Sequence, residues 1–246
     1  MKKLMIAASA VLCATVGFGL ESANIVGFQD YPLVQGYNLY SPVFEAVGET
    51  MSLQDLKIKG EAVTGGGANN ICLLDAGGVA QGTYGWWMPE DGTGEDGGCW
   101  FDGDNWALID ETVASGQGFY LYAEDTGLSI QSSGSVKLSN YSVELAQGYN
   151  VVGNCTPADL DIQAIKIVGE SVTGGGANNI CLLDAAGVAQ GTYGWWMPDD
   201  GTGEEGGCWF DGDNWALIED TIAAGQGLYV YAEDAGLKLE LPTAVK

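Results

Sequence analysis

The feature that most constrains this chain is a long internal repeat. Residues 61–125 recur as residues 170–234, with ten differences in 65 positions. The match continues outward, because Gln35-Gly-Tyr-Asn38 returns as Gln147-Gly-Tyr-Asn150. A repeat of about 110 residues is too long for a solenoid and is typical of tandem domains. We therefore predict two units of one fold, residues 20–137 and residues 138–246.

The first residues have the pattern of a secretory signal peptide. Met1-Lys2-Lys3 precedes an apolar run that ends at Phe18, and such a run is too short to span a membrane comfortably. We predict cleavage after Gly19, so that residues 1–19 form the leader. The expected product is secreted, extracellular or on the cell surface, without insertion into a membrane.

Each unit has the pattern of an all-β domain. Short runs rich in β-branched and aromatic residues alternate with glycine-rich turns, which is typical of strands. In the first unit these runs are 24–33, 36–44, 71–74, 79–88, 106–109, 119–123 and 128–131. Many short strands predict a β-sandwich or barrel in each unit.

We also predict one short helix in each unit. In the second unit, Thr156 has the properties of an N-cap, Pro157 suits the first helical position, and the helix would reach Ile165. In the first unit, Ser52 begins a similar turn that ends near Leu56.

Charge excludes several classes of function. The chain has 33 acidic residues against 8 basic ones, a formal net charge of −25, no histidine and no arginine. Nucleic-acid binding needs clustered basic residues, and the usual catalytic triads and phosphoryl clamps need histidine, arginine or both. Carboxylate pairs hydrolyse glycosides, but with this many acids such pairs arise by chance. We predict that the protein is not an enzyme.

Acidic residues concentrate in the repeated loops. Calcium prefers six to eight oxygen ligands, and the spacing here does not match an EF-hand. One hypothesis is a non-standard calcium site, and the alternative is a solvated acidic turn. The candidate ligands are Asp91, Glu95, Asp96, Asp102 and Asp104, with their copies Asp200, Glu204, Glu205, Asp211 and Asp213.

All eight tryptophans lie in the repeated segments 83–106 and 192–215. With a period of two, Tyr84, Trp86 and Met88 share one face of a strand, and Thr83 and Trp87 share the other. Exposed rings beside carboxylates suit sugars, because rings stack on the apolar sugar face and acids accept hydrogen bonds from hydroxyl groups. The alternative is that most rings belong to the core. The candidate contacts with a glycan or a partner are Trp87, Trp100 and Tyr122, with their copies Trp196, Trp209 and Tyr231.

Five cysteines follow the predicted leader. Cys72 and Cys99 have the same spacing as Cys181 and Cys208, and exported proteins meet an oxidising compartment. We predict the disulfides Cys72–Cys99 and Cys181–Cys208, each stabilising its unit by about 3.5 kcal/mol. Cys155 has no counterpart in the first unit and is predicted to be a small buried apolar residue.

Three motifs carry a resemblance. Glu21-Ser-Ala-Asn-Ile-Val-Gly27, Gln35-Gly-Tyr-Asn38 and Ser115-Gly-Gln-Gly-Phe-Tyr120 resemble the pattern of secreted β-rich repeat proteins of verrucomicrobia- and lentisphaera-like bacteria. The likeness covers the edges of each unit. It implies an exported β-domain and no catalytic activity.

Two functions fit these features. The first is a non-enzymatic structural protein outside the cell or on its surface, which self-associates and is stabilised by calcium. The second is a tandem carbohydrate-binding protein that uses the exposed tryptophans, tyrosines and acids.

Overall fold

The computed structural model describes residues 26–45, 50–75, 79–92, 97–184, 188–200 and 206–243. These residues form antiparallel sheets joined by turns, so the predicted all-β fold is confirmed. Within these ranges, the helical segments are 3-10 turns of three residues. None of the helices described there is long and apolar enough to cross a membrane.

In the described part of the first half, eleven strands form three sheets. The order of the largest sheet is β2-β10-β5-β6-β7-β8, a second sheet has the order β1-β11-β4, and β3 pairs with β9. The strands are β1 (Val26–Pro32), β2 (Gly36–Tyr40), β3 (Thr50–Ser52), β4 (Lys57–Lys59), β5 (Asn70–Leu74), β6 (Ala80–Trp87), β7 (Cys99–Asp102), β8 (Ala107–Leu108), β9 (Thr112–Ala114), β10 (Phe119–Ala123) and β11 (Ser129–Ser135).

In the described part of the second half, the other eleven strands form corresponding sheets. Their orders are β13-β21-β16-β17-β18-β19, β12-β22-β15 and β14-β20. The strands are β12 (Tyr141–Glu144), β13 (Gly148–Gly153), β14 (Leu160–Asp161), β15 (Lys166–Val168), β16 (Asn179–Leu183), β17 (Ala189–Trp196), β18 (Cys208–Asp211), β19 (Ala216–Leu217), β20 (Thr221–Ile222), β21 (Gly227–Ala232) and β22 (Lys238–Leu241).

The core of the first half lies between the six-stranded and the three-stranded sheets. Ile71, Trp86 and Phe119 come from the larger sheet and are fully buried in one cluster with Ile58 and Ile130 from the smaller sheet. Because side chains alternate along a strand, the other face of the larger sheet carries a separate set of residues.

The helix prediction is partly wrong. In the first half, η1 (Leu53–Asp55) begins after Ser52, whose hydroxyl accepts a hydrogen bond from the Gln54 amide at 3.2 Å. In the second half, η3 (Ile162–Ala164) begins after Asp161, not after Thr156. The Thr156 amide instead donates to the side chain of Asn154 at 2.9 Å. Two further turns, η2 (Pro89–Asp91) and η4 (Pro198–Asp200), follow β6 and β17.

The predicted disulfides are wrong. Cys72 on β5 lies opposite Thr83 on β6, whereas Cys99 on β7 lies opposite Trp87 on the same β6 strand. The two cysteines are therefore two strands apart, about 10 Å, and four residues apart along the strands, about 13 Å. A disulfide requires Cα atoms within about 7 Å. The same register separates Cys181 from Cys208, and all five described cysteines are free thiols.

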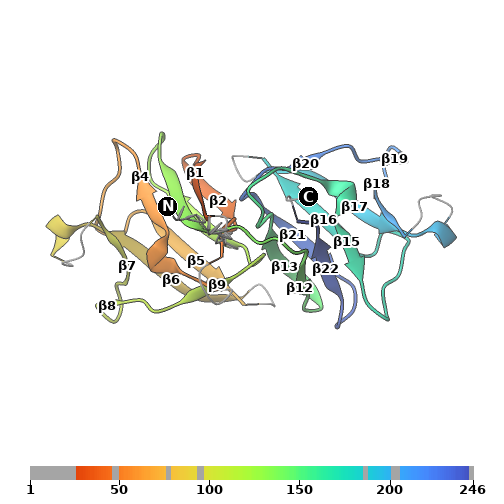
Figure 1. Ribbon diagram of the computed structural model, residues 1–246, viewed down its shortest axis with the longest axis horizontal. Coiled ribbons are helices and arrows are strands. Elements are labelled where there is room, and N and C mark those ends of the chain that lie inside the picture. The colour runs from red at the N-terminus through yellow and green to blue at the C-terminus, as the bar shows by residue number, and fades with distance from the viewer. Residues whose placement is uncertain are drawn as a thin grey trace, which may run out of the picture.

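The two halves meet through reciprocal contacts. Figure 1 shows two lobes along the long axis, with β7 and β8 at one end and β18 and β19 at the other. The Ser41 amide donates to the Gly225 carbonyl at 3.0 Å, and the Gly153 amide donates to the Gly116 carbonyl at 3.1 Å. Ser41 and Gly153 occupy corresponding positions, as do Gly116 and Gly225. Such a self-complementary contact is typical of two-fold symmetry.

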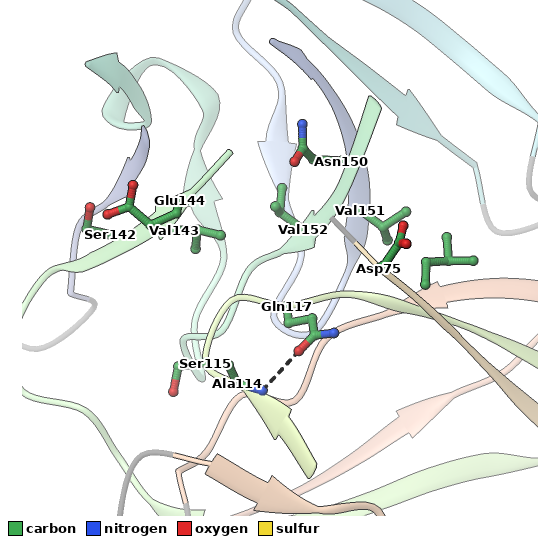
Figure 2. Close-up of a pocket in the computed structure, with 11 residues that line it drawn as sticks. Asp75, Ala114, Ser115, Gln117, Ser142, Val143, Glu144, Asn150, Val151 and Val152 are labelled. Atoms are coloured by element: carbon green, nitrogen blue, oxygen red, sulfur yellow. Dashed lines mark hydrogen bonds between the residues drawn. The ribbon is translucent and has the colours of Figure 1, made fainter. Parts of the chain in front are cut away.

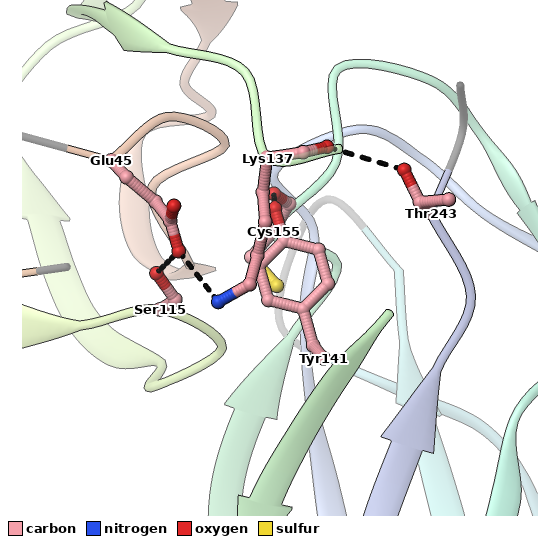
Figure 3. Close-up of polar contacts among 6 residues, drawn as sticks. All are labelled: Glu45, Ser115, Lys137, Tyr141, Cys155 and Thr243. Carbon is pink, nitrogen blue, oxygen red and sulfur yellow. Dashed lines mark hydrogen bonds and ion pairs between the residues drawn. The ribbon is translucent and has the colours of Figure 1, made fainter. Parts of the chain in front are cut away.

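A polar cluster fixes the segment that joins the halves (Figure 3). Lys137 Nζ lies 2.8 Å from Glu45 Oε1, which also accepts a hydrogen bond from the Ser115 hydroxyl at 2.6 Å. The same ammonium group lies 4.6 Å from the centre of the Tyr141 ring. Tyr141 Oη donates to the Cys155 carbonyl at 2.7 Å, and burial raises the pKa of this phenol. Cys155 is buried in the second core, as predicted.

Candidate ligand-binding site

On the outward face of the six-stranded sheet, a row of residues across neighbouring strands has a glycine in its middle. Tyr84 and Trp86 point into the core, as the period of two predicts, and Trp87 lies half-buried on the other face. On that outward face Gly85 of β6 pairs with Asn70 of β5 and with Phe101 of β7. Because Gly85 has no side chain, the backbone of Gly67 packs against the sheet between Asn70 and Phe101.

This tight backbone contact forms the floor of a cavity. A Cβ atom added to Gly85 would lie 2.5 Å from the Gly67 Cα atom, so only glycine fits. Gly67 itself has a φ of 79°, a conformation that favours glycine. We call the resulting cavity the first hollow. Its volume is about 350 Å³, and its lining residues are Gly66, Gly67, Asn70, Thr83, Gly85, Trp87, Gly103 and Asp104.

Trp106 stands beside the first hollow in a strained conformation. Its φ is 53° and 72% of its surface is exposed. Among the described residues other than glycine, only Trp106 and its copy Trp215 have positive φ. A left-handed conformation costs about 1–2 kcal/mol for a residue with a Cβ atom, and such strain concentrates at functional sites.

Asp102 holds the turn that leads to Trp106. One carboxylate oxygen accepts hydrogen bonds from the Asp104 amide at 2.9 Å and the Asn105 amide at 3.3 Å. The other accepts a hydrogen bond from Asn105 Nδ2 at 2.5 Å. The Asn105 side chain, with these amides, lowers the pKa of the Asp102 carboxyl group. The ionised carboxylate thus stabilises the turn that presents the indole.

Three rings form an aromatic wall at the first hollow. The Trp87 ring lies 5.8 Å from the Trp106 ring and 5.8 Å from the Phe101 ring, and Phe101 lies 6.2 Å from Trp106. The planes are tilted or edge-to-face, which are favourable geometries for aromatic pairs. The wall is therefore preorganised, and part of its surface remains accessible.

The second half has a matching arrangement, which we call the second hollow. Its volume is about 380 Å³, and Trp215 beside it has a φ of 52° with 67% of its surface exposed. The Trp215 ring lies 5.5 Å from Trp196 and 6.0 Å from Phe210. The residues that line it are Gly175, Gly176, Asn179, Thr192, Gly194, Trp196, Asp211, Gly212 and Asp213.

Trp100 and Trp209 do not belong to this surface. Both are fully buried, and their Nε1 atoms donate to the Leu56 carbonyl at 2.8 Å and to the Ile165 carbonyl at 2.9 Å. A ligand cannot reach their ring faces, so the prediction that they contact a glycan is wrong. The exposed rings beside the hollows are those of Trp106 and Trp215, which the sequence analysis did not select. The Asp-Gly-Asp-Asn turn before each of them was the available signal, because a residue that ends such a turn lies outside the regular strand.

Tyr122 and Tyr231 lie on the outward face, next to the hollows. Tyr122 pairs with Asn70 across β10 and β5, and its ring lies 5.1 Å from the exposed Tyr37 ring. Tyr231 pairs with Asn179, and its ring lies 5.1 Å from Tyr149. Each tyrosine therefore extends the aromatic surface from a hollow toward the middle of the molecule.

Asp91 and Asp200 of the repeated loops stabilise the fold. Asp91 Oδ2 accepts hydrogen bonds from the Gly66 amide at 2.8 Å and the Met88 amide at 3.0 Å. Asp200 does the same for Gly175 at 2.7 Å and Met197 at 3.0 Å. These bonds tie the glycine-rich loops to the segments after β6 and β17.

The predicted calcium ligands are only partly visible. Glu95, Asp96, Glu204 and Glu205 lie outside the described residues. Among the residues that the structure does describe, no group of three or more acids, cysteines or histidines is arranged to hold a metal ion. Calcium binding stays a prediction.

Another pocket lies between the halves (Figure 2). Its volume is about 370 Å³, with Asp75 and Gln117 from the first half and Val143 and Val151 from the second. Gln117 Oε1 accepts a hydrogen bond from the Ala114 amide at 3.2 Å. None of the residues that line it is aromatic, so it lacks the stacking surface found at the two hollows.

Comparison of the chain with protein-family models, with curated proteins and with solved structures gives no match.

Proposed function

We propose that this chain is an exported, non-catalytic protein, built from two copies of one β unit, that binds carbohydrate at two equivalent sites. The observation that carries the proposal is the exposed, left-handed tryptophan beside each hollow, Trp106 and Trp215. A strained, exposed indole is unfavourable for folding alone, since it combines backbone strain with apolar surface in water.

The chemistry of the first hollow suits a sugar. Trp87 and Trp106 offer ring surface for the apolar face of a pyranose, on which aromatic rings stack. Asn70, Thr83 and Asp104 line the same cavity and carry hydrogen-bonding side chains for hydroxyl groups. The glycine floor lets a ring approach the backbone closely. The same residue types line the second hollow.

The negative charge of the protein favours neutral sugars over anionic ones as ligands. A formal net charge of −25 repels polyanions such as uronic acid or sulfated chains. Asp104 and Asp213 add a carboxylate to each hollow. We therefore propose neutral polysaccharide as the ligand.

The proposal is tested with a panel of neutral and anionic polysaccharides, by affinity electrophoresis and by the change in tryptophan fluorescence. We expect retention by at least one neutral polysaccharide, and loss of retention in the double variant Trp106→Ala/Trp215→Ala. Phe28→Ala is the matched control, because Phe28 is an exposed aromatic residue on β1 in the other sheet. If no polysaccharide retains the unmodified protein, the proposal is wrong.

Self-association with calcium stays the competing prediction. Light scattering of the protein with millimolar calcium and with chelator tests it. Large species that form only with calcium, without binding to polysaccharide, would favour that function.

A further inference from the structure

We propose that the first hollow is one end of a groove that reaches the second half, so that the ligand is a chain of several sugar units. This inference rests on the proposed carbohydrate-binding function and goes beyond it. It specifies binding along an internal stretch of polysaccharide, not recognition of a single terminal sugar.

The groove is continuous because two neighbouring cavities have lining residues in common. Asn70 and Thr83 line the first hollow and also line a neighbouring pocket of about 480 Å³. A ligand that passes over these two side chains leaves one cavity and enters the next. The other residues of the neighbouring pocket are Tyr37, Asn38, Leu39, Cys72, Tyr120, Leu183 and Tyr229.

The far wall of this pocket belongs to the second half. Leu183 lies at the end of β16 and Tyr229 lies on β21, whereas Tyr37 and Tyr120 come from β2 and β10 of the first half. Hydrogen bonds between the halves hold them together, including the one from the Gly118 amide to the Val151 carbonyl at 3.1 Å. The groove is therefore complete only when both halves are in contact.

Aromatic rings follow the groove without a long interruption. Tyr122 lies next to Asn70 in the sheet. From there the Tyr37 ring lies 5.1 Å from Tyr122 and 6.1 Å from Tyr120, and the Tyr120 ring lies 6.2 Å from Tyr229. Successive rings with hydroxyl groups offer stacking and hydrogen bonding along a chain of sugars.

The length of the groove exceeds one sugar. Phe101 on β7 and Tyr37 on β2 lie on the outward face of one sheet, with β6, β5 and β10 between these strands. Four strand spacings of about 4.8 Å give about 19 Å. A single pyranose cannot fill this distance, and an oligosaccharide can.

The test uses a background in which one hollow remains. Trp215→Ala removes the exposed indole of the second hollow, so that binding reports on the first. A series of oligosaccharides of increasing length, cut from the neutral polysaccharide that binds best, is titrated by calorimetry. We expect affinity to rise with length until the groove is filled, then to level off.

Tyr229→Ala in this background distinguishes the groove from an isolated hollow. We expect about a fivefold loss of affinity for the longest oligosaccharide and no change for a disaccharide, because Tyr229 lies far along the groove. Phe28→Ala is the control, since Phe28 is an exposed aromatic residue on β1 of the other sheet and does not line the groove. Tyr229→Phe keeps the ring and should keep most of the affinity.

Two results would overturn the groove. One is affinity that does not rise beyond a disaccharide, and the other is an equal effect of Tyr229→Ala and Phe28→Ala on the longest ligand. Absence of binding at every length and to the intact polysaccharide would instead contradict the proposed function itself.

Discussion

Two tryptophan pairs of the first half differ in position although they are neighbours in sequence. Trp86 and Trp100 are fully buried, with ring centres 5.0 Å apart. Trp87 and Trp106 have ring centres 5.8 Å apart and lie on the outward face. Each pair consists of two tryptophans, so residue type does not explain the difference. The alternation of side chains along the strands and the turn before Trp106 determine which pair is in the core and which is exposed.

The largest effect is expected from a substitution in the buried pair. Trp100→Ala removes a fully buried indole that donates to the Leu56 carbonyl, and we expect a loss of about 3–5 kcal/mol in the free energy of unfolding. Denaturation with urea measures it. A loss below about 1 kcal/mol would contradict the placement of Trp100 in the core.

The cysteines differ in burial, although Cys99 and Cys208 lie on the outward faces of their sheets together with Cys72 and Cys181. Cys72 and Cys181 are half-buried, whereas Cys99, Cys155 and Cys208 are buried. Burial also raises the pKa of the Cys155 thiol to about 12. We expect iodoacetamide at pH 8 to alkylate Cys72 and Cys181 at least tenfold faster than the other three, since the thiolate is the nucleophile. Mass spectrometry of peptides measures this order, and a Cys72–Cys99 crosslink in the native protein would contradict the register of β5, β6 and β7.

A smaller effect is expected when the exposed pair is broken. Trp106→Gly relieves the strain of a φ of 53° and loses two ring contacts, so the free energy of unfolding should change by no more than about 1 kcal/mol. Binding of polysaccharide at the first hollow should be lost. Thermal unfolding together with calorimetric titration separates the two quantities. A loss of stability as large as that of Trp100→Ala would remove the contrast between the pairs.

The smallest expected effect is the pH dependence of polysaccharide binding, which arises from Asp102 in the turn before Trp106. The folded pKa of Asp102 lies below the ordinary value of 3.8 because the Asn105 side chain and backbone amides bind the carboxylate. Its stabilisation is therefore complete above pH 3.8 and is lost as the pH falls through the lower folded pKa. Affinity for polysaccharide should weaken in that acid range. Asp102→Asn should flatten the pH dependence, and an unchanged pH profile would show that Asp102 does not hold the turn.

The sequence predicts much of the fold, because strand signals are local. The expected runs 71–74 and 119–123 match β5 (Asn70–Leu74) and β10 (Phe119–Ala123), and the period of two places Trp86 and Trp87 on the correct faces. The disulfides were mispredicted because equal spacing along the chain does not give the order of strands in a sheet. In that order β6 separates the two cysteine-bearing strands.

The site was harder to predict than the fold. The sequence does not show which way Trp100 points, because Cys-Trp-Phe is apolar at all three positions and has no alternation. In the structure all three residues are buried. The first hollow depends on Gly67 approaching Gly85, which lie 18 residues apart in the sequence. The groove also needs Tyr229 from the second half. Contacts of this kind arise from tertiary packing and leave no local signal.

The most direct test of the account is the number of binding sites per chain. Calorimetric titration with a neutral disaccharide that binds the protein should give two sites. Trp106→Ala and Trp215→Ala should each leave one site, and the double variant should leave none, with all variants folded by circular dichroism. Two sites that persist in the double variant would contradict the claim that the exposed tryptophans beside the hollows bind the ligand.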